Sequence, residues 1–178
     1  MQTDSLLKYQ EQEYRVVKIG EQWWIAQNLN SLPDEVSPAD SSYWCYNNLQ
    51  ENCRKYGKLY NFESAQTACP CDWKLPSKTD FDDLLEFIEN RAENIFGGTA
   101  LKSEKEWESI NSDLYGFSAL PSGFRDKNGN FATLGTQAFF WTSTESENQV
   151  YHRALRNDQN LYSGLSDKEL GYSIRCVK

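Results

Sequence analysis

The chain contains a single histidine, His152, and this limits the catalytic sites that the sequence can form. A hydrolytic triad needs a nucleophile, a base that takes its proton and a group that orients the base. His152 stands between Tyr151 and Arg153 in a strand-like run, and no nucleophile-elbow, zinc-protease, P-loop or dinucleotide-binding pattern accompanies it. We therefore predict that His152 is a surface or hydrogen-bonded structural residue, and that the chain has no catalytic residues.

Carboxylates are abundant, because the chain has 26 acidic residues. A glycosidase places two carboxyl groups about 5–10 Å apart across the bond that it cleaves. Glu145, Glu147 and Asp158 are available for such a pair, but among so many acids some pair always looks suitable. A polysaccharide hydrolase is therefore the weakest of the functions that we consider.

Five cysteines could bind a metal, form disulfides or remain reduced. Cys69-x-Cys71 and His152 would supply part of a zinc site, but such a site needs further ligands at the usual spacings, so we predict no metal and no cofactor. In an exported protein, the odd number leaves at least one thiol without an internal partner. The other possibility is a cytosolic protein in which all the cysteines are reduced.

The first third of the chain is predicted to be a β-ribbon followed by a loop and a helix. Strand-like runs at 14–19 and 22–28 are separated by a Gly-Glu pair that is typical of a tight hairpin. From 31 to 52 the composition changes to Pro, Asp, Ser and Asn, which predicts an irregular loop. A short helix is predicted near 60–68.

The clearest helix is predicted to begin after Ser77. The Ser77 hydroxyl can cap the backbone N–H of Asp80 while the Asp80 carboxylate reaches back, which is the capping-box arrangement. Apolar residues then follow at helical spacing, at Phe81, Leu84 and Ile88 among others, and predict one buried face. The acidic residues in this region are therefore interpreted as capping and surface residues.

The second half is predicted to be rich in β-structure. Asn128-Gly129 is a type I′ hairpin signal between short strand-like runs on either side. Further short strands are predicted at 138–144, 150–156, 160–164 and 171–177. A β-ribbon, two helices and a β-rich second half, in that order, indicate an α+β fold rather than alternating βαβ units.

The length of 178 residues suits one domain with its own core. Residues 1–13 are polar, so we expect a disordered or artificial N-terminus there and a single domain at 14–178. No apolar run of roughly 18 residues that could span a bilayer occurs, nor does a signal-peptide pattern. We expect Met1 to begin an artificial N-terminus, with a signal peptide or lipoprotein anchor upstream in the natural chain.

The formal charge of −8 disfavours a nucleic-acid partner, because it repels a phosphate backbone. We expect a monomer.

The chain has 6 Trp, and Trp73, Trp107 and Trp141 are predicted to fill the core. Neighbours on a strand face opposite ways, so of Trp23 and Trp24 one is predicted to be buried and the other partly exposed.

A set of short motifs occurs in a fixed order along the chain. They are Tyr56-Gly57-Lys58-Leu59-Tyr60-Asn61, Cys69-Pro70-Cys71-Asp72-Trp73-Lys74-Leu75-Pro76, Gly116-Phe117-Ser118-Ala119-Leu120-Pro121, Phe140-Trp141-Thr142-Ser143-Thr144-Glu145 and Gly171-Tyr172-Ser173-Ile174-Arg175-Cys176-Val177. Together they resemble the Fibrobacter succinogenes major paralogous domain, a family of exported bacterial domains related in fold to C-type lectins. The resemblance covers roughly residues 14–178. It implies a C-type-lectin-like α+β fold and carries over no catalytic residue.

The resemblance also favours two disulfides, Cys45–Cys53 and Cys69–Cys176. The first would pin a short polar loop, and the second would join the first half of the domain to its last strand. Cys71 is then left over. The family usually has another residue at that position, so Cys71 could instead take the place of Cys69.

We expect an exported recognition domain, secreted or displayed at a bacterial cell surface, that binds a glycan or a surface protein in adhesion. A structural or protein–protein interaction scaffold is the alternative. The Glu-Pro-Asn or Gln-Pro-Asp and Trp-Asn-Asp triplets of calcium-dependent lectins do not occur, and the nearest match is Arg156-Asn157-Asp158. The sequence therefore predicts a calcium-free site of aromatic and polar side chains. The candidates are Tyr43, Trp44, Tyr46, Tyr151, Arg153, Asn157, Asp158, Asn160 and Tyr162.

Overall fold

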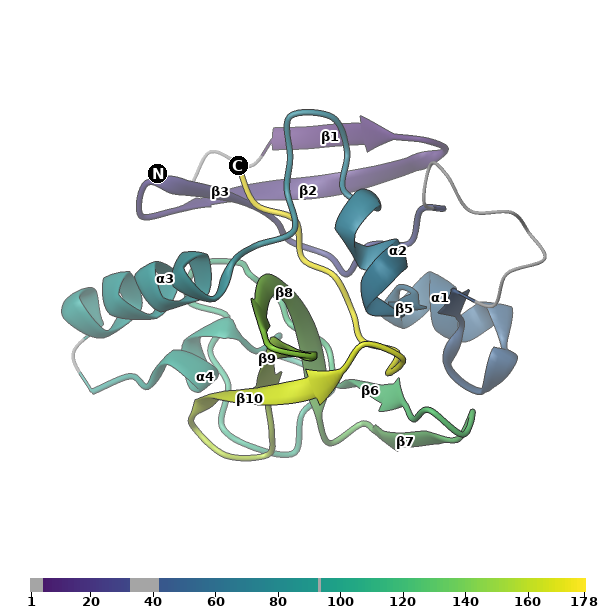
Figure 1. Ribbon diagram of the computed structural model, residues 1–178. Coiled ribbons are helices and arrows are strands. Elements are labelled where there is room, and N and C mark those ends of the chain that lie inside the picture. Colours follow the sequence, from purple (N-terminus) through teal and green to yellow (C-terminus); the bar gives the residue numbers. More distant parts are fainter. Residues whose placement is uncertain (1–4, 33–41, 93) are drawn as a thin grey trace.

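A three-stranded sheet, a five-stranded sheet and several short helices make up the fold in the computed structural model, which describes residues 5–32, 42–92 and 94–178 (Figure 1). The helices are not interleaved with the strands as βαβ units. The predicted α+β class is therefore confirmed.

The N-terminal sheet consists of β1 (Ser5–Tyr9), β2 (Gln12–Ile19) and β3 (Gln22–Ile25), in that spatial order. The predicted hairpin between β2 and β3 is confirmed. The expectation of disorder over 1–13 is wrong from residue 5 onward, because β1 pairs with β2 along its whole length. Leu7 in β1 also packs against the core, which holds this polar ribbon in place.

The second sheet has the order β10-β9-β8-β6-β7, and all of its neighbours are antiparallel except β6 and β8. Its strands are β6 (Ser122–Arg125), β7 (Phe131–Leu134), β8 (Ala138–Ser146), β9 (Gln149–Leu155) and β10 (Leu161–Asp167). The predicted β-rich second half is confirmed in outline.

The turn between β6 and β7 differs from the expected type I′ turn. Arg125 pairs with Phe131, so residues 126–130 form a longer loop than a two-residue hairpin turn. The Asp126 carboxylate accepts hydrogen bonds from the backbone N–H groups of Asn128 and Asn130, both at 2.8 Å. A side-chain acceptor therefore organises this loop, which the Asn-Gly signal alone does not reveal.

Residues 171–177, predicted as a strand, form an extended segment that makes isolated bridges rather than a continuous ladder. The N–H of Ile25 donates to the Cys176 carbonyl at 3.0 Å, and the N–H of Trp141 donates to the Ser173 carbonyl at 3.1 Å. The segment therefore lies between β3 and β8 and joins the two sheets (Figure 1).

The helices are α1 (Gln50–Tyr56), α2 (Phe62–Thr67), α3 (Lys78–Arg91) and α4 (Gly97–Leu101). The predicted helix near 60–68 and the capping box at Ser77 are confirmed. The expectation of two helices is too low, because α1 begins at the end of the predicted loop of 31–52 and α4 begins at Gly97. Neither has a side-chain cap, so the local signals that identify α3 are missing.

Two further short strands, β4 (Tyr43–Trp44) and β5 (Leu59–Tyr60), pair with each other on either side of α1. A 3-10 turn, η1 (Tyr46–Asn48), connects β4 to α1. The described part of the long loop is thus ordered around α1.

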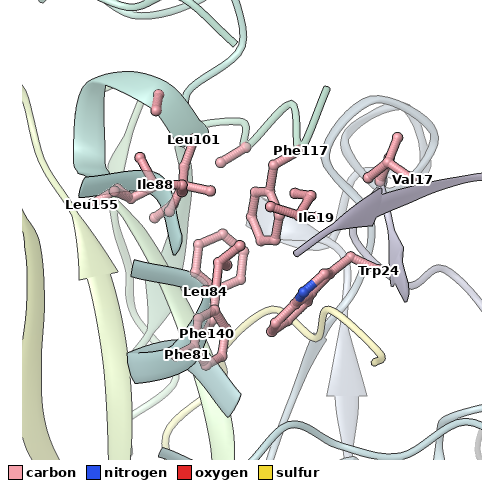
Figure 2. Packing of buried hydrophobic residues seen from close by; sticks show 14 of the residues in the cluster. Val17, Ile19, Trp24, Phe81, Leu84, Ile88, Leu101, Phe117, Phe140 and Leu155 are labelled. Carbon is pink, nitrogen blue, oxygen red and sulfur yellow. The ribbon is translucent and has the colours of Figure 1, made fainter. Parts of the chain in front are cut away.

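Apolar side chains cover both faces of the five-stranded sheet. On one face, Phe81, Leu84 and Ile88 of α3 are fully buried together with Trp24 and Phe140, as Figure 2 shows. On the other face, a second cluster joins α2 and the C-terminal segment to the sheet. The predicted amphipathic face of α3 is confirmed.

The core tryptophans follow the sequence prediction. Trp24 and Trp141 have no exposed surface, whereas Trp23, the neighbour of Trp24, is half-buried. Trp107 is 8% exposed and Trp73 packs at the edge of the second cluster. Large aromatic side chains thus supply much of the buried area in a chain of modest apolar content.

Both disulfides that the resemblance favours are present, Cys45–Cys53 and Cys69–Cys176, while Cys71 is a free, exposed thiol. Disulfides persist in oxidising compartments, so the pairing is consistent with an extracellular protein. Across the described ranges, none of the helices has both the length and the apolar character that crossing a bilayer requires.

Reduction is expected to destabilise the fold, because the Cys69–Cys176 disulfide restricts the unfolded chain over a sequence separation of 107 residues. We expect a loss of about 2–4 kcal/mol and a melting temperature lower by about 5–15 °C in strong reductant. Differential scanning calorimetry checks this. The Cys71→Ser variant should melt as the wild type does, and a melting curve unchanged by reductant would contradict the prediction.

Candidate functional site

The aromatic candidates from the long loop, Tyr43, Trp44 and Tyr46, lie around β4 and take part in packing. The ring of Tyr43 lies 6.4 Å from that of Tyr60. Tyr46 is 8% exposed and packs against Phe131, with 5.2 Å between ring centroids. Trp44 is half-buried. The rings of Tyr43 and Tyr46 therefore pack against neighbouring side chains and do not form an open aromatic surface.

Tyr151 and Arg153 lie elsewhere, on the face of β9 that packs against α3. Arg153 is 4% exposed, and its guanidinium pairs with the Asp82 carboxylate and donates to the Lys78 carbonyl at 3.0 Å. The Arg153 charge is therefore used inside the fold, where it holds α3 against the sheet.

The remaining candidates surround the turn between β9 and β10. The Tyr162 hydroxyl donates to the Asp158 carboxylate at 2.9 Å, and Asn157 and Asn160 are exposed in the same turn. The Asn160 carbonyl lies against Gly98 of α4. Figure 1 shows α4 at one end of β10 and β5 near the other, so the structure places the candidates on separate surfaces.

Cationic side chains of the chain itself cover some of the candidate rings. The Arg125 guanidinium lies 4.0 Å from the centroid of Trp44, and the Arg156 guanidinium lies 4.6 Å from that of Tyr162. These are favourable cation–π contacts. One face of each ring is therefore occupied and not available to stack on a sugar.

Two of the motifs that carry the family resemblance, at 116–121 and 171–177, meet instead at one buried cation, Arg175. It has no exposed surface. Its Nε donates to Asn28 Oδ1 at 2.7 Å, its Nη2 donates to the Ser118 carbonyl at 3.0 Å, and its Nη1 donates to the Phe117 carbonyl. Its guanidinium also lies 4.6 Å from the Phe117 ring centroid. The C-terminal segment is thereby fixed to the loop at 116–118.

Burial lowers the pKa of Arg175 to about 9, while the nearby Asp113 carboxylate raises it and the charge of Arg15 lowers it. The guanidinium therefore stays protonated at neutral pH. A buried charge is tolerated only where hydrogen bonds replace the lost water, and here carbonyl and amide oxygens do so. Ser118 adopts a φ of 53°, a left-handed conformation that turns the chain in this loop.

Arg175→Lys is expected to destabilise the protein by about 3 kcal/mol, because it keeps the charge but loses the planar fork that donates to several acceptors at once. Urea unfolding measures the change. Arg156→Lys, at an exposed position, is the matched control and should change the free energy of unfolding by less than about 0.5 kcal/mol. Equal effects of the two substitutions would show that Arg175 has no special structural role.

A pocket of about 320 Å³ lies beside this cluster, and we call it the Asn28 pocket. Asn28 is 4% exposed and its amide Nδ2 donates to the Tyr56 carbonyl at 2.8 Å. Gly57 has a φ of 76°, and a Cβ there would lie 2.6 Å from the Asn28 Cβ, so only glycine allows this approach. The lining residues are Gln12, Glu13, Tyr14, Arg15, Ala26, Gln27, Asn28, Asn30, Cys53, Arg54, Lys55, Tyr56, Gly57, Ser118 and Leu120.

The Asn28 pocket brings together β2, the segment after β3, α1 and the loop before β6. Its polar side chains are amides, hydroxyls, cations and one carboxylate, that of Glu13, among the described residues. Cys53 is the one lining cysteine, and its disulfide with Cys45 removes it as a nucleophile. The arrangement therefore suits noncovalent binding.

Of the pocket residues, the sequence analysis names Cys53 as a disulfide partner and none as a ligand-binding residue. The only local signals were the motifs around Gly57 and Ser118, since Arg15 and Asn28 lie in ordinary strand-like surroundings. Their association depends on the tertiary fold.

A second depression, of about 530 Å³, lies between the β2–β3 turn and α3. Its charged lining is mainly acidic, with Glu21, Asp83 and Glu86 against one cation, Arg91. Within the described ranges, no group of three or more His, Cys, Asp or Glu side chains could hold a metal ion. The described lining of this second depression includes none of the motif residues, so the Asn28 pocket is the stronger candidate site.

His152 has a structural environment, as the sequence analysis predicts. Its Nδ1 shares a hydrogen bond of 2.8 Å with the Ser166 hydroxyl, which also bonds to the Tyr172 hydroxyl at 2.9 Å. Ser166 is 5% exposed. Burial lowers the pKa of His152 to about 4, and the positive charges of Arg156 and Arg153 add to this effect. The imidazole is therefore neutral at physiological pH.

The protein is expected to lose stability as the pH falls from about 6.5 to 4. The unfolded chain protonates His152 near its ordinary pKa of 6.5, whereas the folded chain does so only near 4, so protonation favours the unfolded state in this window. We expect a loss of about 2 kcal/mol from this residue. Urea unfolding at pH 7 and pH 4.5 measures it. In His152→Gln the difference between the two pH values should be smaller, and an equal difference would contradict the assignment.

One family matches the sequence, described as the Fibrobacter succinogenes major domain, and the match covers residues 17–178. No curated protein and no solved structure matches the chain. The matched range includes all five motifs and most of the residues that line the Asn28 pocket. It begins after Arg15, so Arg15 and the lining residues before it lie outside the match.

Proposed function

The chain belongs to the Fibrobacter succinogenes major domain family, and we propose that it is a non-enzymatic, exported recognition domain that binds glycans in the Asn28 pocket. The observation that carries the proposal is the assembly of this pocket. Side chains from distant parts of the chain line it, and buried hydrogen bonds to Tyr56 and Arg175 hold Asn28, one of its lining residues, in place. A preformed pocket binds with little loss of conformational entropy.

The size and the polar groups of the pocket support a sugar ligand. Its volume of about 320 Å³ lies within the range of small-molecule sites. The exposed amides of Gln12 and Gln27 can donate to and accept from hydroxyl groups.

Export is supported by the two disulfides, because such bonds are stable in oxidising compartments. We also propose that the fold is C-type-lectin-like. Hydrogen bonds between Trp23 and Lys178 place the N-terminal ribbon and the C-terminal end side by side, and the Cys69–Cys176 disulfide closes the domain next to them.

A rigid scaffold for protein–protein interaction is the second candidate. It is favoured by the burial of Arg175, Phe117 and Tyr60, which shows that many motif residues support the fold directly. Such a scaffold would present its surface loops to a protein partner and leave the pocket empty.

A glycan array with pocket-blocking variants separates these functions. Gln12→Trp places a bulky ring at an exposed lining position of β2 and is expected to reduce glycan binding at least tenfold with little change in melting temperature. Lys18→Trp, an exposed position on the same strand outside the pocket lining, is the control and should bind normally.

Three other results would contradict the proposal. Loss of binding on Trp44→Ala at an unchanged melting temperature, with Gln12→Trp active, would move the site to β4. A blank array, together with a protein partner recovered by pull-down, would favour the scaffold. Release of reducing sugars from polysaccharides would instead show an enzyme.

A further inference from the structure

The charge of the Asn28 pocket is opposite to that of the chain as a whole. The chain has a formal charge of −8, yet the described residues of the pocket lining include Arg15, Arg54 and Lys55 and only one acid, Glu13. A recess lined with charges of one sign concentrates the field inside it and attracts ligands of the opposite charge.

Ion pairing inside the protein neutralises only part of this lining. Glu13 lies 3.1 Å from Lys8, and Lys55 lies 2.7 Å from Glu106. These pairs account for the pocket's acid and for its lysine. Among the described residues, no carboxylate lies within ion-pairing distance of the Arg15 guanidinium or of the Arg54 guanidinium.

Arg15 is held in place by the same loop that Arg175 supports. Its Nη2 donates to the Gly116 carbonyl at 2.9 Å and to the Ser118 hydroxyl at 2.6 Å. Its backbone N–H donates to Gln27 Oε1 at 2.7 Å. Its Nη2 is thus anchored to two protein oxygens, while its Nε and Nη1 have no partner in the described part of the chain and can each donate singly.

Arg54 lies in the last turn of α1 and is exposed at the rim of the pocket. The Cys45–Cys53 disulfide, at the neighbouring residue, fixes the helix that carries it. Arg15 and Arg54 therefore reach the pocket from different elements, each of which is tied down by its own contacts.

We propose that the glycan bound in the Asn28 pocket carries a carboxylate, as a uronic acid residue does, and that Arg15 and Arg54 bind it. This inference rests on the proposed function of the pocket. Arg54 can present parallel N–H donors that match the two oxygens of a carboxylate, and Arg15 can add single hydrogen bonds from Nε or Nη1; such charge-assisted hydrogen bonds are stronger than neutral ones. The amides of Gln12 and Gln27 then contact the sugar hydroxyls.

Isothermal titration calorimetry with matched ligands tests this inference. The probes are an oligogalacturonate, its fully methyl-esterified form, which keeps the sugar but loses the charge, and a neutral galactose oligomer of equal length. The acidic oligomer should bind at least tenfold more tightly than both neutral ligands, and its affinity should fall as the salt concentration rises.

Arg54→Gln should weaken binding of the acidic oligomer about tenfold, because a hydrogen bond to a charged group contributes about 1.5 kcal/mol or more. Lys127→Gln, an exposed cation in the β6–β7 loop, is the matched control and should bind as the wild type does. Since Arg54 is exposed, neither substitution should change the melting temperature.

The outcomes distinguish this inference from the proposed function. Equal binding of the acidic and esterified oligomers, with loss of both in Gln12→Trp, would overturn the carboxylate while leaving the pocket as a glycan site. Binding of the acidic oligomer that Arg54→Gln leaves unchanged would also overturn it. No binding of any of the three oligomers would overturn the inference, and the array would then decide the proposed function separately.

Discussion

The buried guanidinium of Arg175 is the contact on which the arrangement of this domain depends. A fully buried charge is costly unless protein groups replace its hydration, so the surrounding chain must bring oxygens to it. The Phe117 and Ser118 carbonyls and the Asn28 amide oxygen do so, and these residues lie 58, 57 and 147 positions before Arg175 in the sequence. The left-handed Ser118 is one consequence, because this conformation turns the loop toward the guanidinium.

The C-terminal segment transmits this constraint to both sheets. It hydrogen-bonds to β3 through Ile25 and to β8 through Trp141, and the Cys69–Cys176 disulfide fixes its end. Apolar clusters then fill the space on each face of the five-stranded sheet. The Asn28 pocket forms where this assembly reaches the surface, so the contacts that stabilise the fold also shape the proposed binding site.

The fold was predictable where its signals are local. The capping box at Ser77, the apolar stripe of α3 and the alternation of Trp23 and Trp24 each lie within a few residues, and the structure agrees with all of them. The helix α1 was missed because a disulfide and a neighbouring strand pair stabilise it rather than a cap. The candidate site was not predicted because its residues come from distant parts of the sequence, and only the tertiary fold brings them together. Tyr43 and Trp44 look available in a polar loop, and only the tertiary structure shows which residues cover them.

The position of Arg15 argues for function rather than stability. Its contacts to the Gly116 carbonyl and the Ser118 hydroxyl require hydrogen-bond donors but no charge, so a neutral amide could make them. Its positive charge is unfavourable to Arg175, whose pKa it lowers. The chain has 26 acids, yet within the described ranges none pairs with Arg15. The Asp113 carboxylate, which accepts from the Ser118 hydroxyl, offsets part of the repulsion between the two cations, and the proposed anionic ligand would offset more of it on binding.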